Sequence, residues 1–313
     1  MSAADGRNAA GTLMRRATYA SLTVAGTMIL VKLGAWLMTD SVSLLSSLLD
    51  SLLDAASSLV NLVAVHQALI PPDREHRFGH GKAEPLASLG QAAFITGSAA
   101  VLMIQALQHM LTPQPVSNTG IGIAVMVFAI LVTLILVVYQ RSVIHRTGSL
   151  VVSADEFHYR ADLILNGGVI VSLLATATIG WVYLDPIFGA AIGFWIIYGA
   201  WRVGMKAVVQ LMDRELPDDE RARIRRIALE HPQVRSVHDL RTRAAGPTAF
   251  IQIHLEMDGK LTLNEAHRIS DAVEADILAA FPQSEVMIHQ DPEGVEEPRR
   301  SFPPASASSR LAS

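Results

Sequence analysis

The chain of 313 residues contains no cysteine, which excludes disulfide bonds and thiolate metal sites. Any metal ion must be bound by histidine, aspartate or glutamate, and these ligands favour zinc, ferrous iron or manganese over copper(I). Only 17% of the residues are charged and no long basic block occurs, so nucleic acid is not an expected partner. The sequence also lacks an HExxH motif, a nucleophile elbow and a complete P-loop. These absences argue against an enzyme and against a nucleotide as a partner.

Half of the residues are hydrophobic, and long apolar runs dominate the first two thirds of the chain. Each run is close to the roughly 20 residues that a helix needs to cross a bilayer. The runs cover about residues 18–38, 41–69, 84–112, 118–139, 156–181 and 186–208. Because the first run ends without a small-residue cleavage pattern, we interpret it as a membrane anchor and not as a signal peptide. Lysine and arginine lie before the first run and after the second, fourth and sixth, which places both termini in the cytoplasm.

The sequence changes character at Asp213, where charged residues become frequent. The pattern predicts a helix, two strands, a second helix and a third strand. Thr262 and Glu265 have the spacing of a capping box at the start of the second helix. This order is typical of an open-faced α+β sandwich of the ferredoxin-like or metallochaperone-like αββαβ type. The expected organisation is a cytoplasmic amino-terminal segment (1–17), a transmembrane domain of six helices (18–212), a cytoplasmic α+β domain (213–292) and a disordered tail (293–313).

One polar stripe runs along the second apolar run, because its polar residues recur every three or four positions. A charged residue at mid-membrane costs about 2.5 to 3.5 kcal/mol, so two carboxylates one turn apart need a compensating cation. That cation is a metal ion or a set of protons. The stripe consists of Ser43, Ser47, Asp50, Asp54, Ser57 and Asn61.

The fifth run carries a matching stripe, made of Asp155, His158, Asp162 and Asn166. His158 and Asp162 repeat the i, i+4 spacing of the two acids in the second run. Polar side chains within a membrane can also join helices by hydrogen bonds, but small polar residues usually do this. We therefore favour an ion site between the two helices. Its four ligands, the number that tetrahedral zinc requires, are Asp50, Asp54, His158 and Asp162.

Two further features of the membrane domain allow two interpretations each. Lys32 lies within the first run, where it could extend to the membrane surface or have a function. Asp73, His76 and His80 follow the second run with the spacing of a one-sided metal site, although nearby proline and glycine argue against a regular helix. A solvated loop without metal explains this spacing equally well.

The α+β domain is rich in histidine, with His231, His238, His254, His267 and His289. His254 shares one face of its strand with Gln252 and Glu256, and His289 shares a face with Asp291. Such side chains could bind metal or lie at a dimer surface. Surface histidines without either role are the alternative.

Together these segments resemble the cation diffusion facilitator family, and closely its bacterial ferrous-iron and zinc efflux members. The resemblance extends from about Arg15 to Pro292. It implies a multi-pass protein of the bacterial inner membrane that forms homodimers through its cytoplasmic domain. This sequence departs from the family at Arg160, where the resembling proteins have an uncharged polar residue. The most specific segments are LLDSLLDAASSLVNL, FGHGKAE, FHYRADLILNG, LMDRELPD, HDLRTR, IQIHLEM and IHQDP.

The resemblance also implies a role for each candidate site. The transport site falls on Asp50, Asp54, His158 and Asp162, and a second site falls on the loop residues Asp73, His76 and His80. Lys82 and Asp213 match a charge pair that connects the membrane and cytoplasmic parts. The cytoplasmic metal ions, which join the two subunits, fall on His238, His254, His267, His289 and Asp291.

Without a nucleotide motif, uphill export requires an ion gradient, and metal binding to carboxylates and imidazole releases protons. The expected function is therefore efflux of zinc, with cadmium and ferrous iron as further candidates, by proton antiport with alternating access. His158 is the expected proton carrier, since histidine titrates near neutral pH. A metal sensor or an intramembrane hydrolase could use some of the same residues. The sensor does not need acids in two facing helices, and the hydrolase lacks its usual motifs.

Overall fold

The computed structural model describes residues 3–40, 42–111, 120–179 and 184–295. They form two compact units, one from residue 12 to residue 208 and one from residue 209 onward that also includes the residues before Thr12. Most of the predicted tail lies outside the described residues. The elements are α1 (Ala3–Thr39), α2 (Val42–Ala68), α3 (Ala83–Leu111), α4 (Gly120–Thr147), α5 (Leu150–Ile179), α6 (Leu184–Leu211), α7 (Asp218–Glu230), β1 (Ser236–Ala245), β2 (Thr248–Met257), α8 (Leu263–Ala280) and β3 (Ser284–Pro292).

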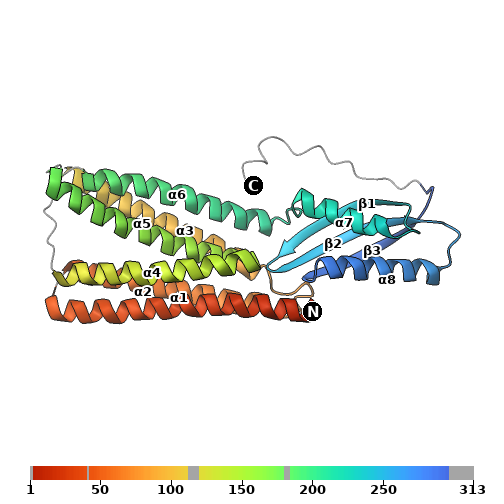
Figure 1. The fold of residues 1–313 in the computed structure, drawn as a ribbon, viewed down its shortest axis with the longest axis horizontal. Helices are drawn as coiled ribbons and strands as arrows, with labels where there is room; N and C mark the ends of the chain where they lie inside the picture. Colours follow the sequence, from red (N-terminus) through yellow and green to blue (C-terminus); the bar gives the residue numbers. More distant parts are fainter. Residues whose placement is uncertain (1–2, 41, 112–119, 180–183, 296–313) are drawn as a thin grey trace. The chain divides into compact units, whose positions relative to one another are not determined.

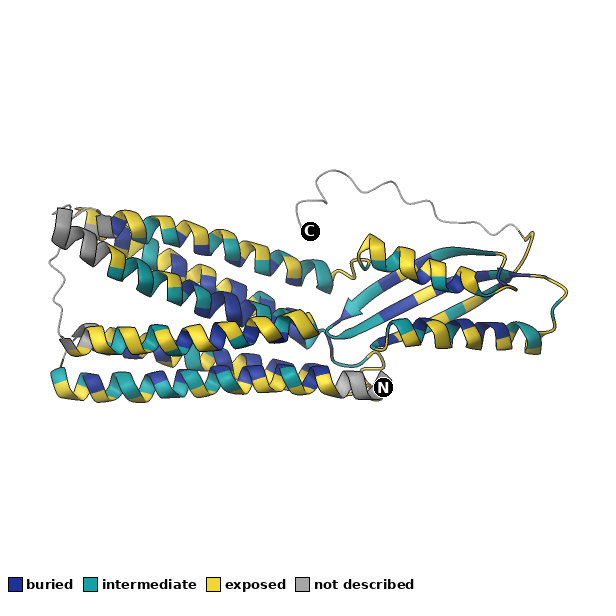
Figure 2. Cartoon of the chain, in the orientation of Figure 1, coloured by how far each residue is buried: buried dark blue, intermediate teal, exposed yellow. Residues whose placement is uncertain are grey.

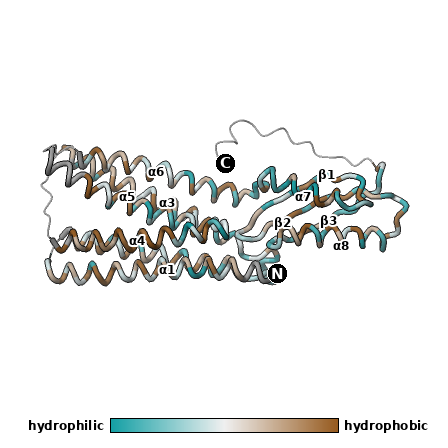
Figure 3. Tube along the Cα trace, in the orientation of Figure 1, coloured by the Kyte–Doolittle hydropathy of each residue, from teal (hydrophilic) through white to brown (hydrophobic). Residues whose placement is uncertain are grey.

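The first unit is a bundle of long helices, α1 to α6, that lie side by side (Figure 1). Among the described residues, five of them are long and apolar enough to cross a membrane. Figure 3 shows how continuous the hydrophobic sequence of α4 is. Helix α5 does not qualify over residues 150–171, whose side chains the structure describes, because Asp155, Glu156, Arg160 and Asp162 fall within this part. The qualifying segments are Ala9–Thr39, Leu44–Ala68, Ala83–Gln108, Ile123–Thr147 and Pro186–Leu211.

Helix α5 is the centre of the bundle. It contributes Phe157 to a buried cluster with α3 and α6, Val151 to one with α1 and α2, and Tyr159 to one with α4. The first three turns of α5 are accordingly the most buried part of its described residues, as the dark blue residues in Figure 2 show. The charged residues that lower the hydropathy of α5 thus lie on the helix that the other helices of the bundle surround.

Three helices extend further than their apolar runs predict. Helix α1 begins at Ala3 instead of near residue 18, α4 continues to Thr147, and α5 begins at Leu150. The hydropathy of a sequence marks the part of a helix that fits the membrane and does not mark where the helix ends. The added turns of α1 and α4 contain alanine or arginine, which tolerate a helix in water, whereas the added turn of α5 places Val151 and Val152 in buried clusters.

Glycine at position 199 of α6 allows the ring of Phe157 to approach the helix backbone. A Cβ atom at this position would lie 2.0 Å from Cζ and 2.3 Å from Cε2 of Phe157, which is only 4% exposed. We therefore expect Gly199→Ala to displace the ring and to lower the stability of the membrane domain by about 1 to 3 kcal/mol. Thermal unfolding of the purified protein in detergent measures this loss.

Gly204→Ala is the matched control on the same helix. A Cβ atom there would meet Ala92 at 3.4 Å, and no nearer atom lies in the described residues. Because alanine is a better helix former than glycine by about 0.8 to 1.0 kcal/mol, this variant should be neutral or slightly stabilising. Equal destabilisation by both variants would contradict the close approach of Phe157.

In the second unit, the described residues form a three-stranded sheet in the order β1-β2-β3. Strand β2 pairs antiparallel with β1 and parallel with β3. Helix α7 packs on β1 and α8, and α8 packs on β3, so both helices cover one face of the sheet. Ile251, Ile253 and Leu255 of β2 point into this core, which confirms the predicted order of elements and the alternation along β2. The opposite face carries the histidines.

The predicted capping box at the start of α8 is confirmed. The Thr262 hydroxyl accepts a hydrogen bond from the backbone N–H of Glu265 at 3.3 Å, and the backbone N–H of Thr262 donates to Glu265 Oε2 at 2.8 Å. The hydrogen bond from the Thr262 backbone holds the pKa of Glu265 below its usual range. Helix α8 therefore begins at a defined residue next to the sheet.

Candidate metal centres

The first candidate centre lies between α2 and α5 and contains Asp54, His158 and Asp162. His158 Nε2 lies 2.9 Å from Asp54 Oδ1 and 3.7 Å from Asp162 Oδ2. One ligand atom of each residue lies within 4.8 Å of the other two, close enough for all three to share a metal ion. The His158 side chain is only 8% exposed, whereas the two carboxylates are 23% and 37% exposed. The centre is thus buried on the histidine side and accessible on the carboxylate side.

Asp50, the fourth expected ligand, lines the same cavity as Asp54 and Asp162. This cavity has a volume of about 150 Å³ and lies among α1, α2, α4 and α5. Asp50 is exposed, and it is not among the three residues whose ligand atoms come together. The structure therefore brings three of the predicted ligands together and places the fourth on the adjoining wall.

Lys32 of α1 also lines this cavity, where its ammonium group is hydrogen-bonded to α2. Its Nζ atom donates to Ser51 Oγ at 2.7 Å and to the backbone oxygen of Ser47 at 3.1 Å. An ammonium group beside Asp50 and Asp54 supplies part of the positive charge that these carboxylates need. The sequence left both interpretations of Lys32 open, and the geometry favours the functional one.

Asp155 has a different role from Asp162, the other acid of the α5 stripe. It is 1% exposed, and its carboxylate accepts hydrogen bonds from Ser21 at 2.5 Å, Gln140 at 2.7 Å and Asn61 at 3.0 Å. The donors come from α1, α4 and α2, so this carboxylate joins four helices by hydrogen bonds. Ser58 and Tyr159 form a further pair at 3.1 Å, and the Ser57 hydroxyl donates to Gln91. At Asp155, Asn61 and Ser57, the polar stripes thus join helices by hydrogen bonds, which is the alternative to an ion site.

The second candidate centre is the loop between α2 and α3. His76 Nδ1 and His80 Nε2 each lie 3.5 Å from an oxygen of Asp73, and the two imidazole rings are 4.4 Å apart. Gly79 has a φ of 76°, a left-handed conformation that turns the chain so that His80 lies beside His76. The three ligand atoms again lie within 4.8 Å of one another. The three side chains are therefore brought together by a turn. This agrees with the expectation that nearby proline and glycine argue against a regular helix here.

The carboxylate of Asp73 is held ready for a cation by the backbone. Asp73 Oδ1 accepts hydrogen bonds from the N–H groups of His76 at 2.6 Å and Glu75 at 2.9 Å. These bonds, the one from His76 first, lower the pKa of Asp73. Because the folded pKa lies below the unfolded value, the turn is favoured at neutral pH and weakens as the pH falls through the lowered pKa.

We expect Asp73→Asn to weaken metal binding by the loop at least 10-fold. Losing a group that only supports a metal ligand costs about 10- to 100-fold in affinity, and Asp73 would itself be a ligand. Calorimetric titration with zinc in a protein that also carries Asp54→Asn and Asp291→Asn isolates the loop. Glu75→Gln is the control, since the Glu75 side chain is exposed and is not part of the cluster. Equal affinity in both variants would contradict a site at Asp73.

The third candidate centre lies on the open face of the sheet. His238, His254 and His289 stand side by side on β1, β2 and β3, because the pairing of the strands aligns them. Asp291 is 8% exposed and lies at the middle of the group. Its carboxylate oxygens are 2.8 Å from His254 Nδ1, 3.1 Å from His238 Nε2 and 3.2 Å from His289 Nε2. Ligand atoms of His238, His254 and Asp291 lie within 4.8 Å of one another and form a set that suits zinc, and His289 lies beside them.

Asp239 was missed by the sequence analysis. The pairing of β1 with β2 shifts between His238 and Arg241, and Asp239 within this irregularity has a φ of 42°. Asp239 Oδ2 consequently lies 3.9 Å from His254 Nε2. Arg241 donates two hydrogen bonds to Asp239, at 2.7 and 3.1 Å, and these lower the pKa of Asp239. No sequence pattern marks this residue, because a bulge changes the alternation of the strand.

The remaining predicted residues are not brought into these clusters. His267 lies on α8, is 68% exposed and has Asp271 at 3.6 Å. Asp213 lies 3.5 Å from Arg243 within the second unit. The ligand role of His267 and the charge pair between Lys82 and Asp213 therefore stay predictions.

Two family descriptions match the sequence over nearly all of its folded length. Residues 18–212 match the cation efflux transmembrane domain. Residues 216–293 match the cytoplasmic domain of cation efflux proteins. The two matches meet close to the point where the composition of the sequence changes.

Curated relatives match over the same length. The chain is 49% identical over 282 residues to a cation-efflux pump, FieF, of Citrobacter koseri, covering 90% of this chain and 94% of that protein. It is 48% identical over 285 residues to FieF of Klebsiella pneumoniae, covering 91% of this chain and 95% of that protein. Among solved structures, the metal-bound carboxy-terminal domain of the CzcD transporter from Thermotoga maritima is 30% identical, covering 25% of this chain and 93% of that chain with a TM-score of 0.25.

Proposed function

Because this chain belongs to the cation efflux family, the cation diffusion facilitators, we propose that it exports zinc across the bacterial inner membrane in exchange for protons. The family consists of divalent metal transporters and not of enzymes, so efflux is the premise of the proposal. Cadmium and ferrous iron remain candidate cargo, because three carboxylates and one imidazole suit all three ions. Manganese is less favoured by the imidazole.

The observation that carries the proposal is the cluster of Asp54, His158 and Asp162 inside a bundle of apolar helices. Ionisable side chains are costly within a membrane and are usually retained there for transport or proton transfer. Tetrahedral zinc at about 2.0 to 2.1 Å from its ligands places the ligand atoms roughly 3.3 Å apart. The observed distances of 2.9 and 3.7 Å from His158 Nε2 lie on either side of this value. A small adjustment would therefore form three of the four metal bonds.

We assign the fourth bond to Asp50, which lies one turn before Asp54 on α2 and lines the same cavity. Its carboxylate is exposed, so its side chain is free to turn toward a metal ion. Lys32 compensates these carboxylates when the metal is absent, since its ammonium group lies in the same cavity. Arrival of a divalent cation would make this compensation unnecessary.

Proton exchange follows from the chemistry of the ligands. In the metal-free cluster, His158 Nε2 and Asp54 Oδ1 are hydrogen-bonded, so a proton lies between the atoms that would bind metal. Metal binding requires this proton to leave, and reprotonation releases the metal. One pH unit supplies about 1.4 kcal/mol per proton, and each 100 mV supplies about 2.3 kcal/mol per net charge moved. Proton entry can therefore drive metal exit against a gradient.

The cavity supports a state in which the site is open toward the exterior. It extends along α5 from Tyr159 to Asn166, away from the cytoplasmic start of this helix that the positive-inside rule assigns. On the other side, the hydrogen bonds of Asp155 and the cluster around Met14 and Val151 close the space between the helices. Alternating access would require this second region to open. We include α5 as the sixth spanning helix, since its 30 residues correspond to about 45 Å.

We assign a regulatory role to the cytoplasmic cluster of His238, His254, His289 and Asp291. Zinc bound there would supply a fixed positive charge that holds the three strands together at one face. The family match for this domain supports a homodimer. We assign to His267, which is exposed and lies outside the cluster of its own subunit, a ligand role at the dimer contact. Lys82 and Asp213 would connect the membrane and cytoplasmic parts.

Zinc uptake into proteoliposomes containing the purified protein tests the proposed function. Zinc is supplied outside vesicles whose interior is more acidic than the outside. Under this pH gradient, zinc should accumulate inside the vesicles against its own gradient. Collapse of the pH gradient with a protonophore should abolish the accumulation. Binding of zinc without uptake would contradict the proposal and would favour a metal sensor.

A further inference from the structure

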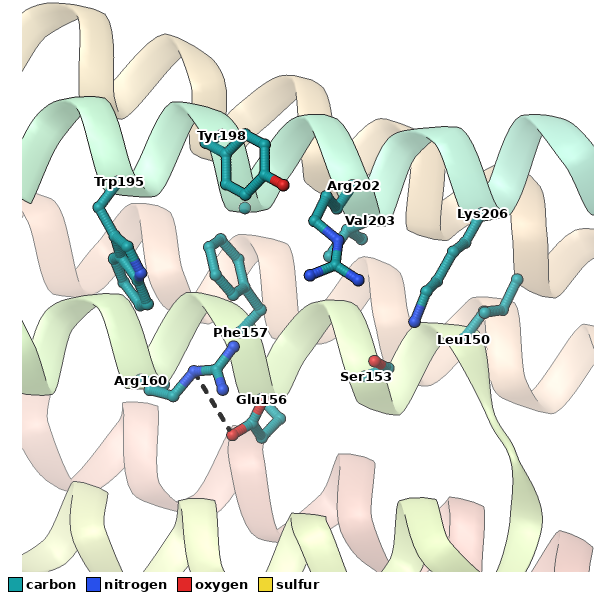
Figure 4. A pocket seen from close by; sticks show the side chains of 11 residues that line it. Leu150, Ser153, Glu156, Phe157, Arg160, Trp195, Tyr198, Arg202, Val203 and Lys206 are labelled. Atoms are coloured by element: carbon teal, nitrogen blue, oxygen red, sulfur yellow. Dashed lines mark ion pairs between the residues drawn. The ribbon is translucent and has the colours of Figure 1, made fainter. Parts of the chain in front are cut away.

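A cavity of about 350 Å³ between α5 and α6 is separate from the candidate metal centres. Its wall carries the cationic side chains of Arg160, Arg202 and Lys206, and the acidic side chain of Glu156. In Figure 4, Arg202 and Lys206 extend from α6 toward α5, and Arg160 lies on the facing wall. A space with this excess of positive charge repels metal cations. Its complementary ligand is an anion.

The acid in this cavity does not neutralise the three cations. Glu156 is 7% exposed and accepts a hydrogen bond from Arg141 of α4 at 2.9 Å. Its negative charge is therefore already paired with a cation that does not line the cavity. Arg160 Nε forms a second, longer ion pair with the same carboxylate at 3.8 Å (Figure 4), and it is buried without a hydrogen-bond partner in the described residues. Over the same described residues, Arg202 and Lys206 form neither an ion pair nor a hydrogen bond. Arg202 and Lys206 are thus available to a ligand, and Arg160 has an unused hydrogen-bond donor.

Aromatic side chains fix the position of Arg160. Its guanidinium carbon lies 5.2 Å from the centre of the Phe157 ring and 5.7 Å from that of Trp195. Contacts of this kind hold a guanidinium group in one plane and leave its edge free for hydrogen bonds. A planar group with several N–H donors matches the oxygens of a phosphate.

We propose that this cavity binds the phosphate group of an anionic phospholipid. Lys206 and Arg202 lie in the last ten residues of α6, near its end, where a headgroup meets a spanning helix. Arg160 lies ten residues after the start of α5, about 15 Å along the helix, so it would meet the inner part of the headgroup. Basic cavities between membrane helices are known as sites for lipid headgroups.

The surroundings of the cavity favour a lipid over free phosphate. Tyr198, which lines the cavity, is 63% exposed, and its neighbours on α6, Phe194 and Trp201, are 65% and 66% exposed. In a membrane such side chains contact lipid, so they offer apolar surface to acyl chains whose headgroup occupies the cavity. A bound lipid would link α6 to α5, the helix that carries His158 and Asp162.

Native mass spectrometry of the full-length protein, released from nanodiscs with equal phosphatidylglycerol and phosphatidylcholine, tests the proposal. The wild type should retain phosphatidylglycerol selectively. Each exposed cation near an anionic lipid contributes about fivefold in affinity, so Arg202→Gln and Lys206→Gln should each reduce selective retention by about that factor. Arg160→Gln should have at least the same effect, and Arg160→Lys should restore part of the retention.

Arg146→Gln is the matched control, because Arg146 is an exposed arginine in the last turn of α4 and does not line the cavity. It should retain phosphatidylglycerol as the wild type does. Equal retention of the two lipids by the wild type would overturn the proposal, and so would selectivity that survives Arg202→Gln together with Lys206→Gln. If millimolar inorganic phosphate displaces the lipid completely, the cavity is a site for free phosphate and the lipid assignment is wrong. This measurement is independent of metal transport.

Discussion

Replacing Asp54 by asparagine should reduce zinc transport in proteoliposomes by more than about 100-fold. Asp54 provides the oxygen 2.9 Å from His158 Nε2, so the variant loses one charged metal ligand and the partner of the histidine. Breaking a buried charge pair by removing one member costs about 3 to 5 kcal/mol, which corresponds to a loss of at least 100-fold in binding. Initial rates of zinc uptake under a fixed pH gradient, together with the zinc affinity of the same preparation, measure the effect.

Two further variants separate this loss from misfolding. Asp54→Glu keeps the charge and moves it outward by one methylene group, so it should retain part of the transport. His66→Gln changes an exposed residue on the same helix, outside the three clusters, and should transport zinc at the rate of the wild type. Transport by Asp54→Asn at a rate within a few fold of the wild type would show that the metal does not pass through this centre.

Helical periodicity predicted the faces of the two stripes but not the partners of each residue. Asp54, His158 and Asp162 do lie together, whereas Asp155, on the same stripe, binds Ser21, Asn61 and Gln140. A spacing of three or four residues places side chains on one face of a helix. Which neighbouring helix a given turn meets depends on how the bundle packs, and the sequence of α5 alone does not contain this.

The position of Lys32 illustrates the same limit. In the sequence, a lysine within an apolar run is compatible with extension to the membrane surface. In the bundle, its ammonium group donates to Ser51 and to the backbone of Ser47 beside the carboxylates. The pattern within one helix likewise does not predict the cavity that contains Arg160, Arg202 and Lys206, because two helices form it.

In the second unit, alternation along the strands was sufficient to predict the open face but not its full set of ligands. Ile251, Ile253 and Leu255 face the helices, so His254 had to face the other side. The alignment of His254 with His238 and His289 comes from the register of the three strands, which depends on their pairing. Asp239 reaches this face only through the irregularity in β1.

The cytoplasmic cluster predicts a large response to metal removal. Zinc bound only by the folded domain, at a free concentration 1,000 times its dissociation constant, stabilises that domain by about 4.1 kcal/mol. Amide hydrogen exchange of β1, β2 and β3 through unfolding of this domain should therefore be roughly 1,000-fold slower with zinc than with a chelator. Mass spectrometry of peptides from the intact protein measures this exchange.

Asp291→Asn should abolish this zinc-dependent protection, because all three imidazoles converge on the Asp291 carboxylate. Without zinc, the wild type should exchange at a rate close to that of the variant, which shows that the protection comes from the metal and not from the carboxylate itself. His231→Gln is the control, since His231 lies at the end of α7 and outside the cluster. If zinc still slows exchange 1,000-fold in Asp291→Asn, the resident metal is bound elsewhere and the histidines of the open face have another role. If zinc protects neither protein, this face does not bind zinc, and the loss of transport in Asp54→Asn would then stand as the separate evidence for metal in the membrane domain.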